Sequence, residues 1–128
     1  MVKKIIRAPG KLPFSKAIVH NQKYTMELSG QVGLNSETGK LEEGIEAQTR
    51  RALENVKEVL QEVGWGLENL IKVRIFLADM KYYSIVNEIY STYFKNDFPT
   101  RMALAVKGLP LGALIEIDCT ASGDDIKE

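Results

Sequence analysis

The chain has 128 residues, of which 45% are hydrophobic and 27% are charged, as is typical of one soluble globular domain. Seventeen basic residues balance seventeen acidic ones, which argues against strong nonspecific binding to nucleic acid. With one cysteine, the chain cannot form an internal disulfide. One cysteine and one histidine in the whole sequence also argue against a nitrogen- or sulfur-rich metal site. The apolar runs are too short for a signal peptide or a membrane-spanning helix, so we expect a soluble, cytoplasmic protein.

The first third of the chain is predicted to form three strands. Lys4–Ala8 reads as a short strand, and a loop with two prolines and a glycine follows it. Ala17–His20 is the second strand, and Lys23–Gly30 is predicted to be its hairpin partner across a two-residue turn. The polar stretch Asn35–Lys40 is predicted to be a turn.

Two helices and three more strands are predicted in the remaining chain. Apolar spacing predicts a helix over about Gly44–Val63, with Gly64 as its C-terminal cap. Leu70–Ala78 alternates and is rich in branched residues, as in a strand. A second helix is expected from the capping residue Asp79 to about Phe94.

The last two strands complete a sheet of six. One of them follows Pro99 and contains Arg101, and Leu114–Ala121 is the other. The polar tail, residues 122–128, is expected to fray. Because each helix links two strands, we predict an α+β fold with a mixed six-stranded sheet and both helices on one face.

Arg101 is the unusual residue, because it keeps its charge at any ordinary pH but lies in a run typical of a buried strand. We expect the large apolar side chains Met102, Leu104 and Val106 to face the helices, so alternation places Arg101 on the opposite face. The same reasoning puts Glu116 and Ser29 on that helix-free face, which we expect to meet another subunit or a ligand. Two interpretations remain open: a structural ion pair of Arg101 with Glu116, or a binding site for an anion.

Several motifs occur in one order along nearly the whole chain. They are APGKLPFSKA (8–17), LSGQVG (28–33), QTRRALENVKEVLQEVG (48–64), VRIFLADM (73–80), VNEIYSTYF (86–94), PTR (99–101) and LP…GALIEI (109–117). In these motifs the chain resembles the Rid family, also called YjgF, of reactive intermediate deaminases. The resemblance implies a single chorismate-mutase-like domain over residues 1–128 and a homotrimer whose helix-free sheet faces pack inward, with active clefts between subunits.

The resemblance also implies an activity. The deaminating members hydrolyse reactive 2-imino acids and their enamine tautomers, such as 2-iminopropanoate and 2-iminobutanoate, to 2-oxo acids and ammonia. The chain would then be a 2-iminobutanoate/2-iminopropanoate deaminase whose ligand is a small 2-imino or 2-oxo acid. The family needs no cofactor and no metal.

Candidate site residues follow from the same resemblance. Arg101 matches the arginine that binds the substrate carboxylate, and Glu116 matches the acid that positions or activates the attacking water. Ser29, Gly30 and Asn87 match residues of the substrate-binding cleft. These residue types suit the reaction, since an imine carbon is already electrophilic and needs orientation, a water and a proton route.

Two positions of the expected cleft depart from the family pattern. Phe14 stands where the deaminases usually have tyrosine, and Ala103 stands where they commonly have cysteine. Phe14 is expected to keep the ring that forms a wall of the substrate site, without the hydroxyl.

Two other functions are compatible with the resemblance. One is a non-enzymatic trimer that binds carboxylate ligands or acts as a chaperone. The other is RNA cleavage or translation inhibition, known for some relatives. Zero net charge and the lack of an aromatic platform for bases count against the RNA function.

Overall fold

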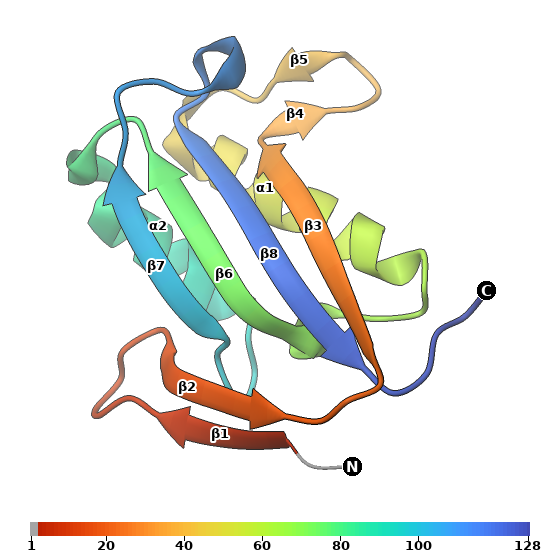
Figure 1. Cartoon of the computed structure of the whole chain (residues 1–128). Helices are drawn as coiled ribbons and strands as arrows, with labels where there is room; N and C mark the ends of the chain where they lie inside the picture. Colours follow the sequence, from red (N-terminus) through yellow and green to blue (C-terminus); the bar gives the residue numbers. More distant parts are fainter. Residues whose placement is uncertain (1–2) are drawn as a thin grey trace.

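The computed structural model describes residues 3–128 and places six strands in one mixed sheet (Figure 1). The strands are β1 (Lys3–Arg7), β2 (Ser15–His20), β3 (Tyr24–Val32), β6 (Leu70–Leu77), β7 (Thr100–Ala105) and β8 (Ile115–Gly123). Their order across the sheet is β1-β2-β7-β6-β8-β3. β6 is parallel to β7 and antiparallel to β8, which is in turn antiparallel to β3. The short strands β4 (Leu34–Asn35) and β5 (Lys40–Leu41) form a separate hairpin.

Two helices, α1 (Gly44–Gln61) and α2 (Tyr83–Thr92), lie side by side behind the sheet in Figure 1. This arrangement confirms the predicted α+β fold. Three single-turn 3-10 helices, Leu67–Asn69, Met80–Tyr82 and Pro110–Gly112, precede β6, α2 and β8. No helix within residues 3–128 is long and apolar enough to cross a membrane.

The end of α1 is set by Gly64, as the sequence predicts. Gly64 has a φ of +79°, a conformation that favours glycine. Its N–H donates to the carbonyl of Gln61, and the N–H of Trp65 donates to the carbonyl of Leu60, both at 3.0 Å. These two bonds satisfy carbonyls that the helix end would otherwise leave without partners.

The hydrophobic core fills the space between the helices and one face of the sheet. Apolar side chains at helical spacing on the helices meet alternate residues of the central strands. The buried apolar residues of these elements are Ala52, Leu53, Val56 and Leu60 of α1, Val86, Ile89 and Tyr90 of α2, Leu70, Val73, Ile75 and Leu77 of β6, and Ile115, Ile117, Cys119 and Ala121 of β8. They fix which face of each strand points toward the helices.

The predicted hairpin between the second and third strands is wrong. β2 pairs with β1 and, at the single position Ser15–Thr100, with β7. β3 pairs instead with β8, more than 80 residues later in the chain. The short link between β2 and β3 therefore connects the β1–β2 end of the strand order to the opposite edge of the sheet, where β3 lies (Figure 1).

The prediction of a fraying C-terminal tail is also wrong. The indole N–H of Trp65 donates to the carbonyl of Asp125 at 2.7 Å. The backbone N–H of Lys127 donates to the carbonyl of Val63 at 3.0 Å. Since Trp65 is 7% exposed and needs a partner for its N–H, the tail completes the packing at the end of α1.

Candidate active site

Arg101 lies on the helix side of the sheet, which corrects the prediction from strand alternation. In the parallel pairing of β7 with β6, Arg101 is level with Val73 and Ala103 is level with Ile75. Val73 and Ile75 are buried beneath the helices, so Arg101 and Ala103 share their face. Met102 consequently points to the helix-free face, where 43% of it is exposed. The prediction failed because it assigned the larger apolar side chains to the helices.

Three aromatic rings enclose the guanidinium of Arg101. Its Cζ lies 5.1 Å from the ring centre of Tyr90, 5.8 Å from that of Tyr83 and 5.9 Å from that of Phe14. Nη2 donates a long hydrogen bond of 3.4 Å to the Tyr83 hydroxyl. Rings at these distances attract a cation and exclude water around it. We call these four residues the arginine cage.

No carboxylate within residues 3–128 forms an ion pair with Arg101. Its Nη1 is buried and has no hydrogen-bond partner among the described residues. The hydroxyl of Tyr90 and the Oδ1 of Asn87 are buried without partners as well. A buried charge without a counterion is costly, which makes Arg101 a candidate for binding an anion.

The tyrosines of the arginine cage come from one stripe of α2. Tyr83, Asn87 and Tyr90 are spaced by four and three residues, which places them on the same side of the helix. Burial raises the pKa of Tyr90 far above its ordinary value, although the nearby Arg101 acts in the opposite direction. The Tyr90 phenol therefore stays neutral and leaves the positive charge of Arg101 uncompensated.

Phe14 is held against the start of β7 by its neighbour Ser15. The backbone N–H of Ser15 donates to the carbonyl of Pro99 at 3.1 Å, and its hydroxyl donates to the carbonyl of Phe98. These bonds place the N-terminal loop next to Arg101, which follows Pro99 by two residues. The loop and α2 thus cover Arg101 from two directions.

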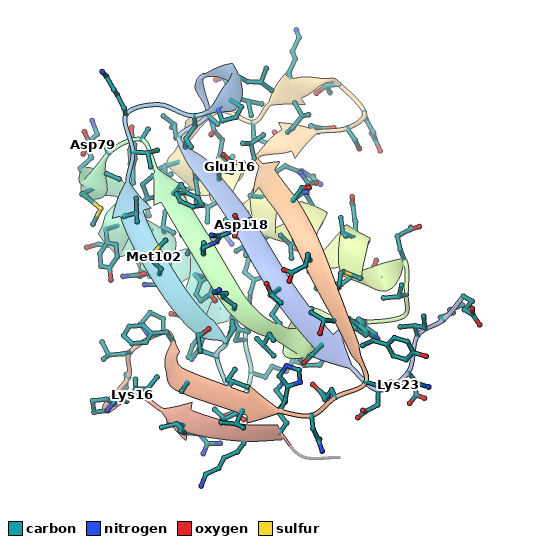
Figure 2. All side chains as sticks on the ribbon, viewed as in Figure 1. Lys16, Lys23, Asp79, Met102, Glu116 and Asp118 are labelled. Carbon is teal, nitrogen blue, oxygen red and sulfur yellow. The ribbon has the colours of Figure 1, made fainter. Side chains whose placement is uncertain are left out.

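Glu116 and Ser29 lie on the helix-free face, as predicted, and Gly30 adjoins the Glu116 side chain there. Figure 2 shows Glu116 projecting from that face together with Met102 and Asp118. The side chain of Glu116 occupies the space where a Cβ on Gly30 would stand, so a larger residue there would require the Glu116 carboxylate to move. The carboxylate of Glu116 makes no hydrogen bond or ion pair with another residue in the described part of the chain. Ser29 is exposed beside Gly30, at an irregularity in the pairing of β3 with β8.

Arg101 and Glu116 are far apart within one subunit. Arg101 is level with Val73 of β6, whereas Glu116 is level with Phe76. Three residues along a strand span about 10 Å, and two strand spacings add about 10 Å across, so the two Cα atoms are roughly 14 Å apart. The side chains also point to opposite faces of the sheet. This geometry rules out the structural ion pair between them.

The helix-free face instead carries a different arginine–carboxylate pair. Arg74 donates to both oxygens of Asp118, through Nε at 2.7 Å and Nη2 at 2.9 Å. Hydrogen bonding to Asp118 raises the pKa of Arg74 further. Next to this pair stand the side chains of Phe76, Leu104 and Met102, because β7 presents its larger residues here. The face is thus more apolar than the sequence indicated, which favours its being covered.

The two positions that depart from the family pattern both lie on the helix side. Phe14 is part of the arginine cage. Ala103 lies two residues after Arg101 in β7 and packs against the core. The lone cysteine, Cys119, is 4% exposed in the core and burial raises its pKa to about 12. It is an inert core residue in this position.

Sequence reasoning missed the roles of Tyr83 and Tyr90 at Arg101. Neither tyrosine was among the candidate site residues. The spacing of these tyrosines from Asn87 is the signal that could have found them, since Asn87 was already a cleft candidate.

The family model described as endoribonuclease L-PSP matches residues 5–122, which is most of the chain. The chain belongs to the Rid/YjgF family. A human 2-iminobutanoate/2-iminopropanoate deaminase is 38% identical to it over 117 residues, covering 90% of this chain and 84% of the human protein. A RutC family protein of Aquifex aeolicus (strain VF5) is 42% identical over 111 residues, covering 85% and 87%.

Solved structures of Rid/YjgF proteins share the fold. RidA from the Antarctic bacterium Psychrobacter sp. PAMC 21119 superposes with a TM-score of 0.75 at 30% identity, covering 93% of this chain and 94% of RidA. The YjgF gene product of E. coli superposes with a TM-score of 0.74 at 28% identity, covering 92% of both chains. The sheet and the two helices described above are therefore those of the Rid/YjgF subunit.

Proposed function

We propose that this Rid/YjgF protein hydrolyses small 2-imino acids, such as 2-iminopropanoate and 2-iminobutanoate, to 2-oxo acids and ammonia. The observation that carries the proposal is the guanidinium of Arg101, enclosed by three rings and without a carboxylate from the described chain. Related proteins named as deaminases for these two imino acids support it.

The substrate carboxylate binds Arg101, with the buried Nη1 as one of the donors. This contact orients the electrophilic carbon of the imine, whose nitrogen is protonated, for attack by a water molecule. The water oxygen bonds to the carbon, the C=N double bond becomes single, and the water loses a proton. A proton then reaches the nitrogen. As the C–N bond breaks, the hydroxyl loses its proton and the C=O double bond forms, so a 2-oxo acid and ammonia leave. The reaction consumes one water and involves no oxidant or reductant.

Glu116 takes the proton from the attacking water and returns it to the nitrogen. Within one subunit it lies on the wrong face of the sheet to reach a substrate on Arg101. Both residues can act on one small molecule only if neighbouring subunits contribute them. We propose a homotrimer in which the helix-free faces pack inward and the clefts form between subunits, a proposal supported by the apolar Phe76 and Met102 on that face.

Tyr83 supplies the hydroxyl that Phe14 lacks. The rings of Tyr83 and Phe14 stand at nearly equal distances from the Arg101 guanidinium, 5.8 and 5.9 Å, so both border an anion bound there. The Tyr83 hydroxyl already accepts a hydrogen bond from Nη2. Its own proton is then available to the substrate carboxylate or, once water has added to the carbon, to the amine nitrogen.

The deciding experiment measures ammonia release from freshly generated 2-iminopropanoate, with and without the protein. We expect the protein to release ammonia much faster than uncatalysed hydrolysis does. The Arg101→Lys variant should lose most of this acceleration. Pyruvate binding without faster ammonia release would instead indicate a non-enzymatic carboxylate-binding trimer. Every aromatic side chain in residues 3–128 is at least partly buried, which counts against a stacking platform for RNA.

A further inference from the structure

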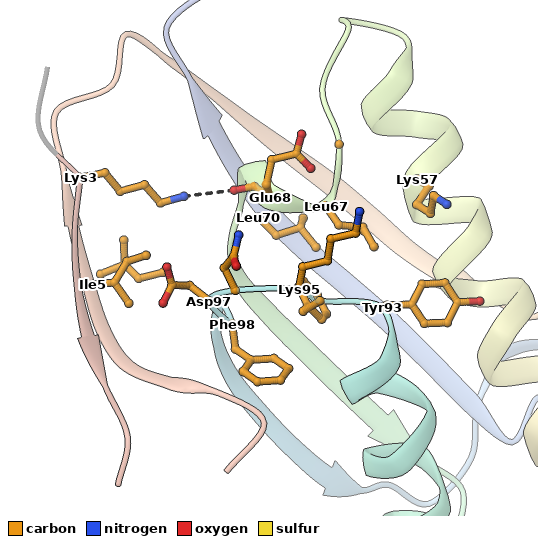
Figure 3. Close-up of a pocket in the computed structure, with 14 residues that line it drawn as sticks. Lys3, Ile5, Lys57, Leu67, Glu68, Leu70, Tyr93, Lys95, Asp97 and Phe98 are labelled. Atoms are coloured by element: carbon orange, nitrogen blue, oxygen red, sulfur yellow. Dashed lines mark hydrogen bonds between the residues drawn. The ribbon is translucent and has the colours of Figure 1, made fainter. Parts of the chain in front are cut away.

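A second cavity, of about 510 Å³, lies between the β1–β2 hairpin and the C-terminal ends of both helices (Figure 3). None of the candidate active-site residues lines it. Phe98 lines the cavity and stacks on Tyr90 of the arginine cage, with ring centres 6.2 Å apart. The aromatic side chains therefore form a wall between this cavity and Arg101.

The cavity exists because β2 diverges from β7, its neighbour in the sheet. β2 is paired with β7 only at Ser15–Thr100, and beyond this position no pairing joins the two strands. The opening is lined by apolar side chains from five different segments of the chain. They are Ile5, Ile18, Leu67, Leu70, Phe94 and Phe98. The rings of Phe94 and Phe98 are tilted by 51° with centres 5.4 Å apart, an arrangement that can hold another ring.

Three lysines surround these apolar lining residues, which we call the apolar floor. They are Lys3 from β1, Lys57 from α1 and Lys95 from the segment after α2, and we call the site the lysine cavity. Figure 3 shows Lys3 reaching the backbone carbonyl of Glu68, to which it donates at 3.2 Å. Lys57 is 3.7 Å from the carboxylate of Glu54.

The acidic side chains neutralise these lysines only in part. Glu68 and Asp97 both line the lysine cavity, but Arg7 holds Asp97 through bonds of 2.7 and 2.8 Å. Since Lys57 pairs with Glu54, Glu68 is left opposite the ammonium groups of Lys3 and Lys95. Burial lowers the pKa of Lys3, with Asp97 and Glu68 acting in the opposite direction, so an anion beside Lys3 would relieve its loss of hydration.

We propose that the lysine cavity is a second ligand site, for an aromatic monocarboxylate whose rings lie on the apolar floor and whose carboxylate meets Lys3. The volume falls within the range of small-molecule sites, about 300–1,000 Å³, and such sites combine an apolar lining with a few polar groups. The proposal does not depend on the proposed function, because the two sites share no residue.

The test is calorimetric titration of the protein with 2-naphthylacetate and with 2-naphthylacetamide, a neutral molecule of the same shape. We expect the carboxylate to bind at least about tenfold more tightly, the lower end for a charge-assisted contact. Equal affinities would overturn the anion assignment. No heat and no displacement of amide resonances at millimolar carboxylate would overturn the site.

Two lysines that follow each other in β1 provide a matched pair of variants. Lys3→Gln removes the ammonium from the lysine cavity and should weaken carboxylate binding about tenfold. Lys4→Gln removes the same charge from an exposed side chain outside the lining and should leave binding unchanged. Equal effects of the two substitutions would show a general charge effect and refute the site.

Binding at the arginine cage is the competing explanation, and Arg101→Gln separates the two. This variant should retain naphthylacetate binding while losing pyruvate binding. Loss of naphthylacetate binding in Arg101→Gln, with none in Lys3→Gln, would overturn the proposal. The imine hydrolysis assay is independent of both outcomes, so failure here leaves the proposed function untouched.

Discussion

Replacing Tyr83 with phenylalanine removes one oxygen from the arginine cage and leaves the ring in place. The hydrogen bond from Arg101 Nη2 is 3.4 Å long, so its loss should cost only about 0.5 kcal/mol of folding free energy. For 128 residues this corresponds to a melting temperature lower by about 2 °C. The contact of the ring with the guanidinium, at 5.8 Å, should persist.

The effect on catalysis should be larger than the effect on stability. If the hydroxyl binds the substrate in the transition state, its loss costs about 1 kcal/mol, or roughly a fivefold decrease in kcat/KM. Steady-state ammonia release from 2-iminopropanoate, measured for both proteins, gives this ratio. Unchanged kcat/KM in Tyr83→Phe would show that the hydroxyl takes no part in the reaction.

A second substitution tests whether the two rings are interchangeable. Phe14→Tyr in the Tyr83→Phe background should restore most of the lost activity, because both rings lie at nearly the same distance from Arg101. The same substitution in the otherwise unchanged protein should add less, since a hydroxyl is already present. Strictly additive effects in this double-mutant cycle would refute the shared role.

Four further predictions concern other residues. Arg101→Lys should weaken pyruvate binding by about 1.5–3 kcal/mol in calorimetry despite the retained charge, because the planar fork is lost. Glu116→Gln should keep pyruvate binding and the trimer but slow imine hydrolysis at least about 100-fold, so a normal turnover number would exclude its role as a base. Met102→Glu should give monomers in light scattering, since it places a charge on the helix-free face proposed to be covered; an unchanged mass would contradict the assembly. Burial raises the pKa of Cys119 from 9.0 to about 12, so the unfolded chain releases this proton at lower pH than the native protein. Stability should therefore fall between pH 9 and 12, by at most about 1.4 kcal/mol per pH unit, and Cys119→Val should remove this part of the decline in urea unfolding.

Local signals in the sequence predicted the elements well. Helical spacing and Gly64 located α1, and alternation located β6 and β8 within two residues of their observed ends. Asp79 does accept a hydrogen bond from the backbone N–H of Lys81, although it caps the 3-10 turn Met80–Tyr82 before α2. These features depend on neighbours within a few residues, so the sequence displays them directly.

Features that depend on distant partners were not predictable in this way. The link after His20 looks like a hairpin turn, but β3 pairs with β8, which no local pattern reveals. The face of Arg101 was misread because both faces of β7 carry apolar residues. Alternation defines two sets of side chains, but only the register with β6 shows which set meets the helices.

The position of β8 has a consequence for biosynthesis. β8 lies between β6 and β3, yet it follows every other strand of the sheet in the chain. Until a ribosome has released residues 115–123, β3 and β6 each keep one edge without its partner. Such edges can pair with other chains, and the late, long-range pairing of β3 with β8 makes folding slow. Nascent chains that stall before residue 115 should therefore be the aggregation-prone form of this protein, and the form that chaperones bind.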